Sequence, residues 1–394
     1  MKKVLIFSLA YYPSHISGAE VAIKEITDRI DSSDITFYMV THRFSKSART
    51  VERIGNVEVH RVGVGPSYVS KMLFVPLAAL KAARLNRTEK FDALWAMMTY
   101  MLLPLVLAKA LGVRGPYALT LQDGDPYEKV FKRWFILPAI PLLNWGFRHA
   151  TRVSAISHYL ATWPKRRGYK REVVLIPNGA SLESAQVYQQ QELDTVAKHL
   201  HKKDGEVLLL SIGRLVHQKG IDTVVRSLPH LPSNVRLVVV GEGPDRYTLT
   251  MLAKELQVLH RVTFVGQVTR EETAKYRAVC DIFVLPSRSE GQGISFLSSM
   301  LSGLPVVATQ VGGLADFLFD AKRNPNTEPT GWAVDPDNSK QIADAVTAIL
   351  ANPEQTNKVV ATAKKMVEEK YNWDAIAKDM HKKVFNPLVA NLAN

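Results

Sequence analysis

Several features are scarce in this chain of 394 residues, and each scarcity excludes a class of protein. The single cysteine, Cys280, rules out a disulfide framework within the chain, which agrees with a reducing cytosol. No uninterrupted apolar run approaches the roughly 18 residues that span a bilayer. No cluster of His, Cys and Asp has the spacing of metal ligands, so we expect no metal site.

Acidic residues are fewer than basic ones, and the net charge of +13 implies an anionic partner. Nucleic acid, an anionic lipid surface and a phosphorylated substrate are the candidates. Nucleic acid is not expected, because no run of clustered Lys and Arg with interleaved aromatics follows one strand or helix. Residues 1–10 could start an export signal, but a first β-strand entering a loop explains them better, so we expect a cytoplasmic location.

The chain length suits two domains, and the order of apolar runs divides it in the same way. Short β-branched runs alternate with longer helical patterns, which predicts an α/β fold with two doubly wound, Rossmann-like domains. The predicted limits are 1–183 for the first domain, 184–204 for a connector, 205–370 for the second domain and 371–394 for a C-terminal helix. The predicted strands are 4–8, 35–40, 57–62, 93–96, 117–121, 152–155 and 173–176, then 207–212, 235–240, 262–265, 281–285, 306–309 and 332–334.

The segment from Ser287 to Val307 predicts a ligand-binding loop between a strand and a helix. Apolar residues at helical spacing follow Glu290, and Gly291 and Gly293 flank the point where the helix begins. Glycine permits close approach of a ligand, and the first turn of a helix offers free N–H groups to an anion. The carboxylate can accept hydrogen bonds from two sugar hydroxyls; the alternative is an acidic residue that only stabilises the helix start.

A second loop with two cations follows the first strand of the second domain. Arg214 and Lys219 lie close enough in this Gly-bounded loop to reach one anionic group. A bidentate guanidinium and a mobile ammonium together suit a diphosphate. The alternative is an ordinary solvated loop.

These motifs resemble those of the nucleotide-sugar glycosyltransferases of family 4, which have the GT-B arrangement of two domains facing each other across a cleft. The string Gly213-Arg-Leu-Val-His-Gln-Lys-Gly220 is similar to the family's Gly-Arg-Leu-(three)-Lys-Gly motif, which implies that Arg214 and Lys219 bind the donor phosphates. Glu290 matches the first residue of the family's Glu-(seven)-Glu pair and would hold hydroxyls of the transferred sugar. The resemblance further implies donor contacts at Gly213, Gly243, Gly266, Gln267, Gly291, Gln292, Gly293 and Ile294.

The chain departs from the family's pattern at three positions. Ser298 stands where the family has its second glutamate, which grips the ribose, so any nucleotide contact by Ser298 is expected to be weaker. Ser181 replaces an aspartate. Gln122 takes the place of a sugar-contacting histidine, and it can hydrogen-bond a sugar hydroxyl but cannot shuttle a proton.

In the first domain, Gly18 lies in a loop that resembles the family's approach to the donor diphosphate and the acceptor. Asp123 and Asp125 follow the predicted strand 117–121. They are the ionisable candidates for binding or orienting an acceptor beside Gln122; the alternative is a pair of turn aspartates.

The resemblance implies a retaining, metal-independent transfer, with a nucleotide diphosphate sugar as co-substrate and no other cofactor. The second domain would bind the donor, and the first a lipid-linked or polysaccharide precursor as the acceptor. The resemblance also implies that the C-terminal helix 371–394 crosses back to the first domain; the alternative is a helix that packs on its own domain. The catalytic residues implied are Arg214, Lys219, Glu290 and Asp123. The rival interpretation, which the three departures favour, is a non-catalytic relative that binds a sugar or a nucleotide.

Two segments, 68–87 and 129–148, combine apolar or aromatic residues with Lys and Arg, a mixture that suits the headgroup layer of a membrane. They predict a peripheral position on the inner face of the cell membrane. Core-facing helices of the first domain explain the apolar residues equally well.

Overall fold

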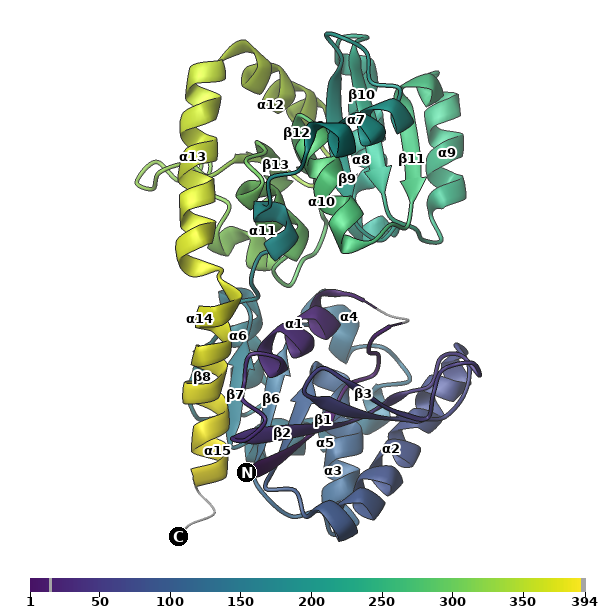
Figure 1. The fold of residues 1–394 in the computed structure, drawn as a ribbon, viewed down its shortest axis with the longest axis vertical. Helices are drawn as coiled ribbons and strands as arrows, with labels where there is room; N and C mark the ends of the chain where they lie inside the picture. The colour runs from purple at the N-terminus through teal and green to yellow at the C-terminus, as the bar shows by residue number, and fades with distance from the viewer. Residues whose placement is uncertain (14–15, 391–394) are drawn as a thin grey trace. The chain divides into compact units, whose positions relative to one another are not determined.

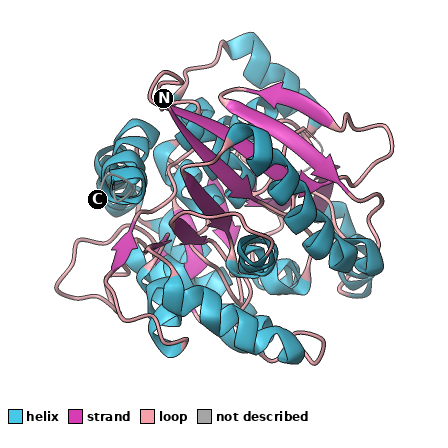
Figure 2. Ribbon diagram, turned by 90° about the horizontal axis from the view of Figure 1, so that it is seen from below, coloured by secondary structure: helices cyan, strands magenta, loops and turns pink. Residues whose placement is uncertain are grey.

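The computed structural model describes residues 1–13 and 16–390 and divides into two compact units (Figure 1). The first unit comprises Met1–Asn178 and the C-terminal segment that begins at Trp373, and the second comprises Gly179–Asn372. Each unit has one mainly parallel sheet, and Figure 2 shows helices, in cyan, flanking the strands, in magenta. The predicted α/β fold with two doubly wound domains is confirmed.

The sheet of the first unit has eight strands in the order β3-β4-β2-β1-β5-β6-β7-β8, and only the pair of β3 and β4 is antiparallel. The strand β2 is buried along its whole length, as expected for a strand covered on both faces. The strands are β1 (Lys2–Phe7), β2 (Ile35–His42), β3 (Val51–Ile54), β4 (Val57–Val62), β5 (Ala93–Met97), β6 (Tyr117–Leu121), β7 (Arg152–Ala155) and β8 (Val173–Leu175). The helices are α1 (Gly18–Thr27), α2 (Tyr68–Glu89), α3 (Leu102–Ala110), α4 (Tyr127–Phe131), α5 (Ile140–His149) and α6 (His158–Arg166).

The C-terminal segment completes the core of the first unit. It consists of α14 (Trp373–Asp379), a π-helical turn (Met380–Phe385) and α15 (Asn386–Ala390). The buried ring of Phe385 packs edge to face on Phe37 of β2, with centroids 5.5 Å apart, and on Trp95 of β5, at 5.1 Å. The segment predicted to return to the first domain therefore supplies part of that domain's core.

The sheet of the second unit has six parallel strands in the order β11-β10-β9-β12-β13-β14. The strand order reverses between β9 and β12, and ligands of doubly wound sheets bind at the carboxyl ends beside such a reversal. Because crossovers between parallel strands are right-handed, α8 and α9 lie on one face of this sheet and α10 and α11 on the other. The strands are β9 (Val207–Ile212), β10 (Val235–Val240), β11 (Val262–Gly266), β12 (Ile282–Leu285), β13 (Val306–Thr309) and β14 (Trp332–Val334). The helices are α7 (Gln190–His199), α8 (Ile221–Ser227), α9 (Arg246–Glu255), α10 (Arg270–Val279), α11 (Ile294–Leu301), α12 (Ser339–Ala351) and α13 (Pro353–Lys370).

The boundary between the units falls at Asn178 and Gly179, whereas the sequence places it after residue 183. The segment predicted as a connector contains α7, which packs against α10. The segment belongs to the second unit because it packs on the core of that unit. The polar composition of the segment does not reveal this contact.

Candidate functional site

The loops that follow β9 and β12 meet through an ion pair at the reversal of strand order. The ammonium Nζ of Lys219 lies 2.5 Å from Oε2 of Glu290. The side chains are 19% and 10% exposed, so both charges are largely removed from solvent but still accessible. The structure thus brings together two of the residues assigned to the donor site, and the assignment itself stays a prediction.

The two loops are also tied together beside this ion pair. The side-chain amide of Gln218 donates to the carbonyl of Ser289 at 2.9 Å, and the backbone N–H of Arg288 donates to the carbonyl of Gln218 at 2.7 Å. The guanidinium of Arg288 forms a bidentate contact with Asp222 at 2.9 and 2.7 Å. Burial opposes ionisation of Asp222, but these hydrogen bonds hold its pKa below the usual value. The loops are therefore held in place without a bound ligand.

Arg214, the third donor-site residue, is exposed at the start of the same loop. Within the ranges 1–13 and 16–390, no hydrogen-bond or ion-pair partner contacts its guanidinium. An exposed, unpaired guanidinium is available for an anion.

Close backbone contacts near the ion pair require glycine at position 312. Gly312 has φ +56°, and a Cβ there would lie 2.1 Å from the carbonyl oxygen of Glu290. The N–H of Gly313 donates to that same oxygen at 3.0 Å. This glycine pair holds the backbone of the candidate sugar-binding residue. Gly293, at φ +92°, begins α11.

The remaining glycines assigned to the donor line the carboxyl edge of the sheet. A Cβ at Gly243 would lie 2.2 Å from the carbonyl oxygen of Leu215, so this position accepts only glycine. Gly266 ends β11 with φ +88°, and the next residue, Gln267, is exposed. Gly291 and Gln292 are buried, whereas Gly213 and Ile294 are partly exposed.

The prediction that Ser298 contacts the nucleotide stays a prediction. Ser298 is wholly buried on the inner face of α11, and its hydroxyl accepts a hydrogen bond from the backbone N–H of Ser181 at 2.9 Å. Two of the three positions that depart from the family pattern are therefore neighbours. A short buried hydroxyl satisfies a backbone donor here, which the sequence could not reveal because the contact joins distant segments.

In the first unit, the side chains after β6 already have partners. Gln122 and Asn178 exchange two amide hydrogen bonds of 3.0 Å each. Asp125 pairs with Lys129 and Arg133, both at 2.9 Å, and its assignment to the acceptor stays a prediction.

Asp123 is 4% exposed and accepts hydrogen bonds from the hydroxyl of Thr99 at 2.9 Å and from its backbone N–H at 3.2 Å. Burial raises the pKa of Asp123 to about 6, although the bonds from Thr99 act in the opposite direction. A carboxyl group that titrates near neutral pH can exchange a proton. Thr99, the second residue after β5, was not predicted from the sequence; a hydroxyl just after a strand end was the available signal.

Gly18 is exposed at the start of α1, where its neighbour Ser17 is the N-cap. The carboxylate of Glu20 accepts from the backbone N–H of Ser17 at 2.8 Å. A helix cap therefore explains the serine that stands beside Gly18.

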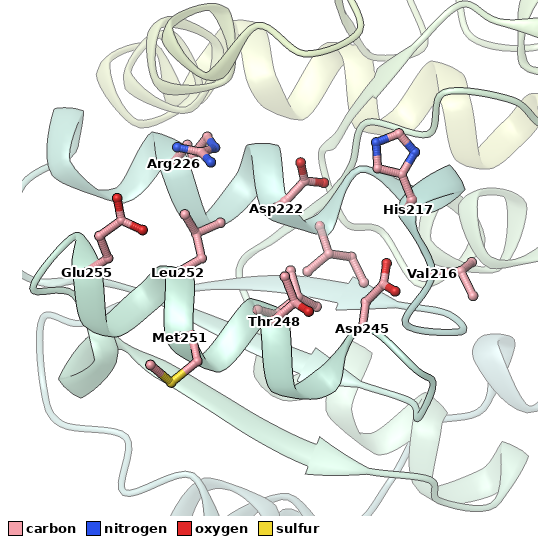
Figure 3. A pocket seen from close by; sticks show the side chains of 11 residues that line it. Val216, His217, Asp222, Arg226, Asp245, Thr248, Met251, Leu252 and Glu255 are labelled. Carbon is pink, nitrogen blue, oxygen red and sulfur yellow. The ribbon is translucent and has the colours of Figure 1, made fainter.

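A separate hollow of about 320 Å³ lies between α8 and α9 (Figure 3). Its lining includes His217, from the loop after β9, together with Asp222 and Glu255. Neither Lys219 nor Glu290 lines it, and it opens on the face of the sheet opposite α10 and α11. It is therefore not part of the Lys219–Glu290 site. In the part of the chain that the structure describes, no group of three or more His, Cys, Asp or Glu side chains could hold a metal ion.

Two family models match the chain. Residues 17–179 match the model of a glycosyl transferase 4-like domain, and residues 194–366 match the model of glycosyl transferases group 1. The two matches correspond to the two units of the structure and together span most of the chain.

Curated proteins with similar sequences include two glycolipid enzymes. A GDP-mannose-dependent alpha-(1-6)-phosphatidylinositol monomannoside mannosyltransferase of Mycobacterium tuberculosis is 34% identical over 179 residues, which cover 43% of this chain and 45% of that protein. The alpha-monoglucosyldiacylglycerol synthase of Streptococcus pneumoniae is 26% identical over 317 residues, which cover 78% of this chain and 70% of that one. The chain spans less than half the length of the curated relatives that it matches at 34% identity or more.

Among solved structures, sucrose-phosphate synthase from Thermosynechococcus elongatus is similar, with a TM-score of 0.85 and 21% identity. The alignment covers 99% of this chain and 100% of that one. At this identity the likeness concerns the fold.

Proposed function

We propose that this chain, which belongs to the family 4 glycosyltransferases of GT-B fold, moves a sugar from a nucleoside-diphosphate donor to a hydroxyl group. The observation that supports this most is the Lys219–Glu290 pair at the carboxyl edge of the second unit, with the unpaired Arg214 in the same loop. An enzyme that releases a diphosphate needs cations at the leaving group and a carboxylate for the sugar hydroxyls.

The donor site would act by electrostatics, without a metal ion. An ammonium group has three N–H donors, so Lys219 can contact Glu290 and still donate to a phosphate oxygen. Lys219 and Arg214 would offset the negative charge that develops on the departing diphosphate. Glu290, oriented by its backbone contacts with Gly312 and Gly313, would accept hydrogen bonds from the transferred sugar. We propose retention of the anomeric configuration.

We propose that the acceptor, a lipid-linked or other glycan precursor, binds to the first unit. The names of the mycobacterial and streptococcal relatives, which refer to phosphatidylinositol and diacylglycerol compounds, support this class of acceptor. Asp123 is the group that would orient the acceptor hydroxyl, since its raised pKa allows it to exchange a proton near pH 6.

Thermal unfolding with a panel of UDP-, GDP- and ADP-sugars tests the proposal. One donor is expected to raise the melting temperature by about 5 °C or more when it is present at about a hundred times its Kd. That donor should then release its nucleoside diphosphate when a lipid-linked acceptor is added. Stabilisation without release for any acceptor favours the non-catalytic rival, and no stabilisation by any donor contradicts both.

We further propose that the first unit docks on an anionic membrane. Helix α2 is apolar on two faces: Phe74, Ala78, Ala79 and Ala82 point into the core, while Tyr68, Val69, Met72, Leu73, Leu77 and Leu80 are exposed. The basic residues Arg84 and Arg87 follow on the same helix, and no ion-pair partner for them lies among the described residues. An exposed apolar stripe beside unpaired cations suits the headgroup layer.

The segment 129–148 has less unpaired positive charge for a membrane surface than its sequence suggests. Lys129, Lys132 and Arg133 are paired with acidic neighbours, although Trp134 is 81% exposed. Its helix α5 and α2 both pack against α3. No helix in the described ranges is both long enough and apolar enough to cross a bilayer.

Replacing Met72 and Leu73 together by serine is expected to lower partitioning onto vesicles that contain phosphatidylglycerol by about tenfold, because several exposed apolar groups that would enter the membrane are lost. Co-sedimentation at low salt measures the effect. The matched control replaces Met251 and Leu259, two exposed apolar residues of the second unit, in the same way. Equal sedimentation of the parent and the Met72/Leu73 variant contradicts membrane docking by α2.

A further inference from the structure

The short turn η3 (Leu182–Ala185) belongs to the second unit. It packs against α10 and α11, the two helices that follow β11 and β12. Both helices begin at the carboxyl ends of their strands. Glu183 of η3 lies beside Arg270, the first residue of α10, whereas Ser184 contacts Arg277 and Ser302 near the ends of α10 and α11. Glu183 is therefore close to the carboxyl end of β11, where α10 begins.

The carboxylate of Glu183, in this turn, has hydrogen-bond and ion-pair partners but is also partly exposed. Oε2 of Glu183 accepts a hydrogen bond from the hydroxyl of Ser181 at 2.5 Å and lies 3.5 Å from the guanidinium of Arg270. The carboxylate also accepts a hydrogen bond from the backbone N–H of Glu183 itself, and the side chain is 29% exposed. A carboxylate has about four lone-pair sites for hydrogen bonds. Glu183 can therefore accept further hydrogen bonds without losing its anchors.

This carboxylate lies next to the position where the family's second glutamate is missing. Ser181 links the two, since its backbone N–H donates to Ser298 and its hydroxyl donates to Glu183. A negative charge is thus available near Ser298, although residue 298 itself carries none. Nearby, Arg277 is buried and donates only to the hydroxyls of Ser184 and Ser299 among the described residues, so a neighbouring anion is electrostatically favoured.

We propose that Glu183 accepts hydrogen bonds from the 2′- and 3′-hydroxyls of the donor's ribose. The inference rests on the proposed function, because it needs a nucleotide in the second unit. A carboxylate accepts bonds from two vicinal hydroxyls through its two oxygens. In a nucleoside diphosphate the ribose joins the base to the phosphates. The interval between Gly266, at the end of β11, and Lys219 is therefore where a ribose would lie.

Glu183 is ionised at neutral pH, as this role requires. Burial raises the pKa of its carboxyl group, but the hydrogen bond from Ser181 and the nearby charges of Arg270 and Arg277 keep that pKa below its usual value.

The ratio of affinities for a ribonucleotide and its 2′-deoxy counterpart tests the proposal. UDP and GDP are each compared with dUDP and dGDP by titration calorimetry. The parent is expected to bind its preferred ribonucleotide about tenfold or more tightly, since a hydrogen bond to a charged acceptor is lost in the deoxy form. Glu183→Ala is expected to bring this ratio to within about twofold of one.

The control is Glu206→Ala, which removes a glutamate that pairs with Arg236 at 2.9 Å where β9 and β10 begin, at the opposite edge of the same sheet. It should keep the parent's discrimination. The ratio is taken within each variant, so a general loss of stability does not imitate the effect. If Glu183→Ala still prefers the ribonucleotide over its 2′-deoxy counterpart, the role of Glu183 is overturned and the proposed function is not. If the parent binds neither UDP nor GDP, both the proposed function and this inference are overturned.

Discussion

Lys219→Ala is expected to lower the rate of sugar transfer by about a hundredfold or more while the fold stays intact. Removing one preorganised charge from a developing anion has an effect of this size. Lys219 is 19% exposed and its partner Glu290 is 10% exposed, so water screens the charge only partly. The loss should appear in kcat more than in donor affinity, because the charge on the departing diphosphate grows as the bond to the sugar breaks.

Release of nucleoside diphosphate under saturating donor measures the effect, and circular dichroism checks the fold. The matched control is Lys202→Ala, which removes a lysine that pairs with Asp281 at 3.2 Å just before β12, away from the carboxyl edge. It should turn over within about threefold of the parent. If Lys219→Ala does the same, Lys219 does not bind the leaving diphosphate.

Phe385→Ala is expected to destabilise the first unit by about 3–5 kcal/mol. The ring is fully buried between Phe37 and Trp95, on the helical segment that packs on β2 and β5. Its removal leaves a cavity that rigid strands cannot fill and also breaks two edge-to-face ring contacts. The second unit, which has its own core, should keep its stability.

Urea unfolding followed by tryptophan fluorescence measures this loss, because every tryptophan except Trp332 lies in the first unit. Lys382→Ala, an exposed change in the same helical turn, should shift the midpoint very little. A midpoint for Phe385→Ala equal to that of the parent would show that the C-terminal segment does not stabilise the first unit.

The sequence predicted strands better than it predicted contacts. The runs 207–212 and 235–240 coincide with β9 and β10, because a strand buried on both faces must be continuously apolar. The strand β3 was missed: it is a partly exposed edge strand, and its signal was the turn at Gly55 and Asn56 that joins it to β4.

In the candidate site too, the positions of residues at strand ends could be predicted better than their side-chain contacts. Lys219 and Glu290 could be predicted to meet, since each follows a strand and the two strands are neighbours in a doubly wound sheet. The burial of Ser298 and the amide pair of Gln122 with Asn178 could not be predicted, because each joins segments far apart in the chain. The sequence identifies which residues lie at the strand ends, but side-chain partners depend on packing.

The discontinuity of the first unit has a consequence for the order of biosynthesis. The ribosome makes the strands of this unit first, yet Phe385, Val384 and Leu388, which close its core, emerge only after the whole second unit. The second unit, encoded as the uninterrupted stretch Gly179–Asn372, can complete its core before the first does. Domains generally fold as units from the N-terminus during synthesis. Here the nascent first unit must instead keep an apolar sheet face uncovered until the second unit has been synthesised, and it is the part of the chain that we expect chaperones to bind.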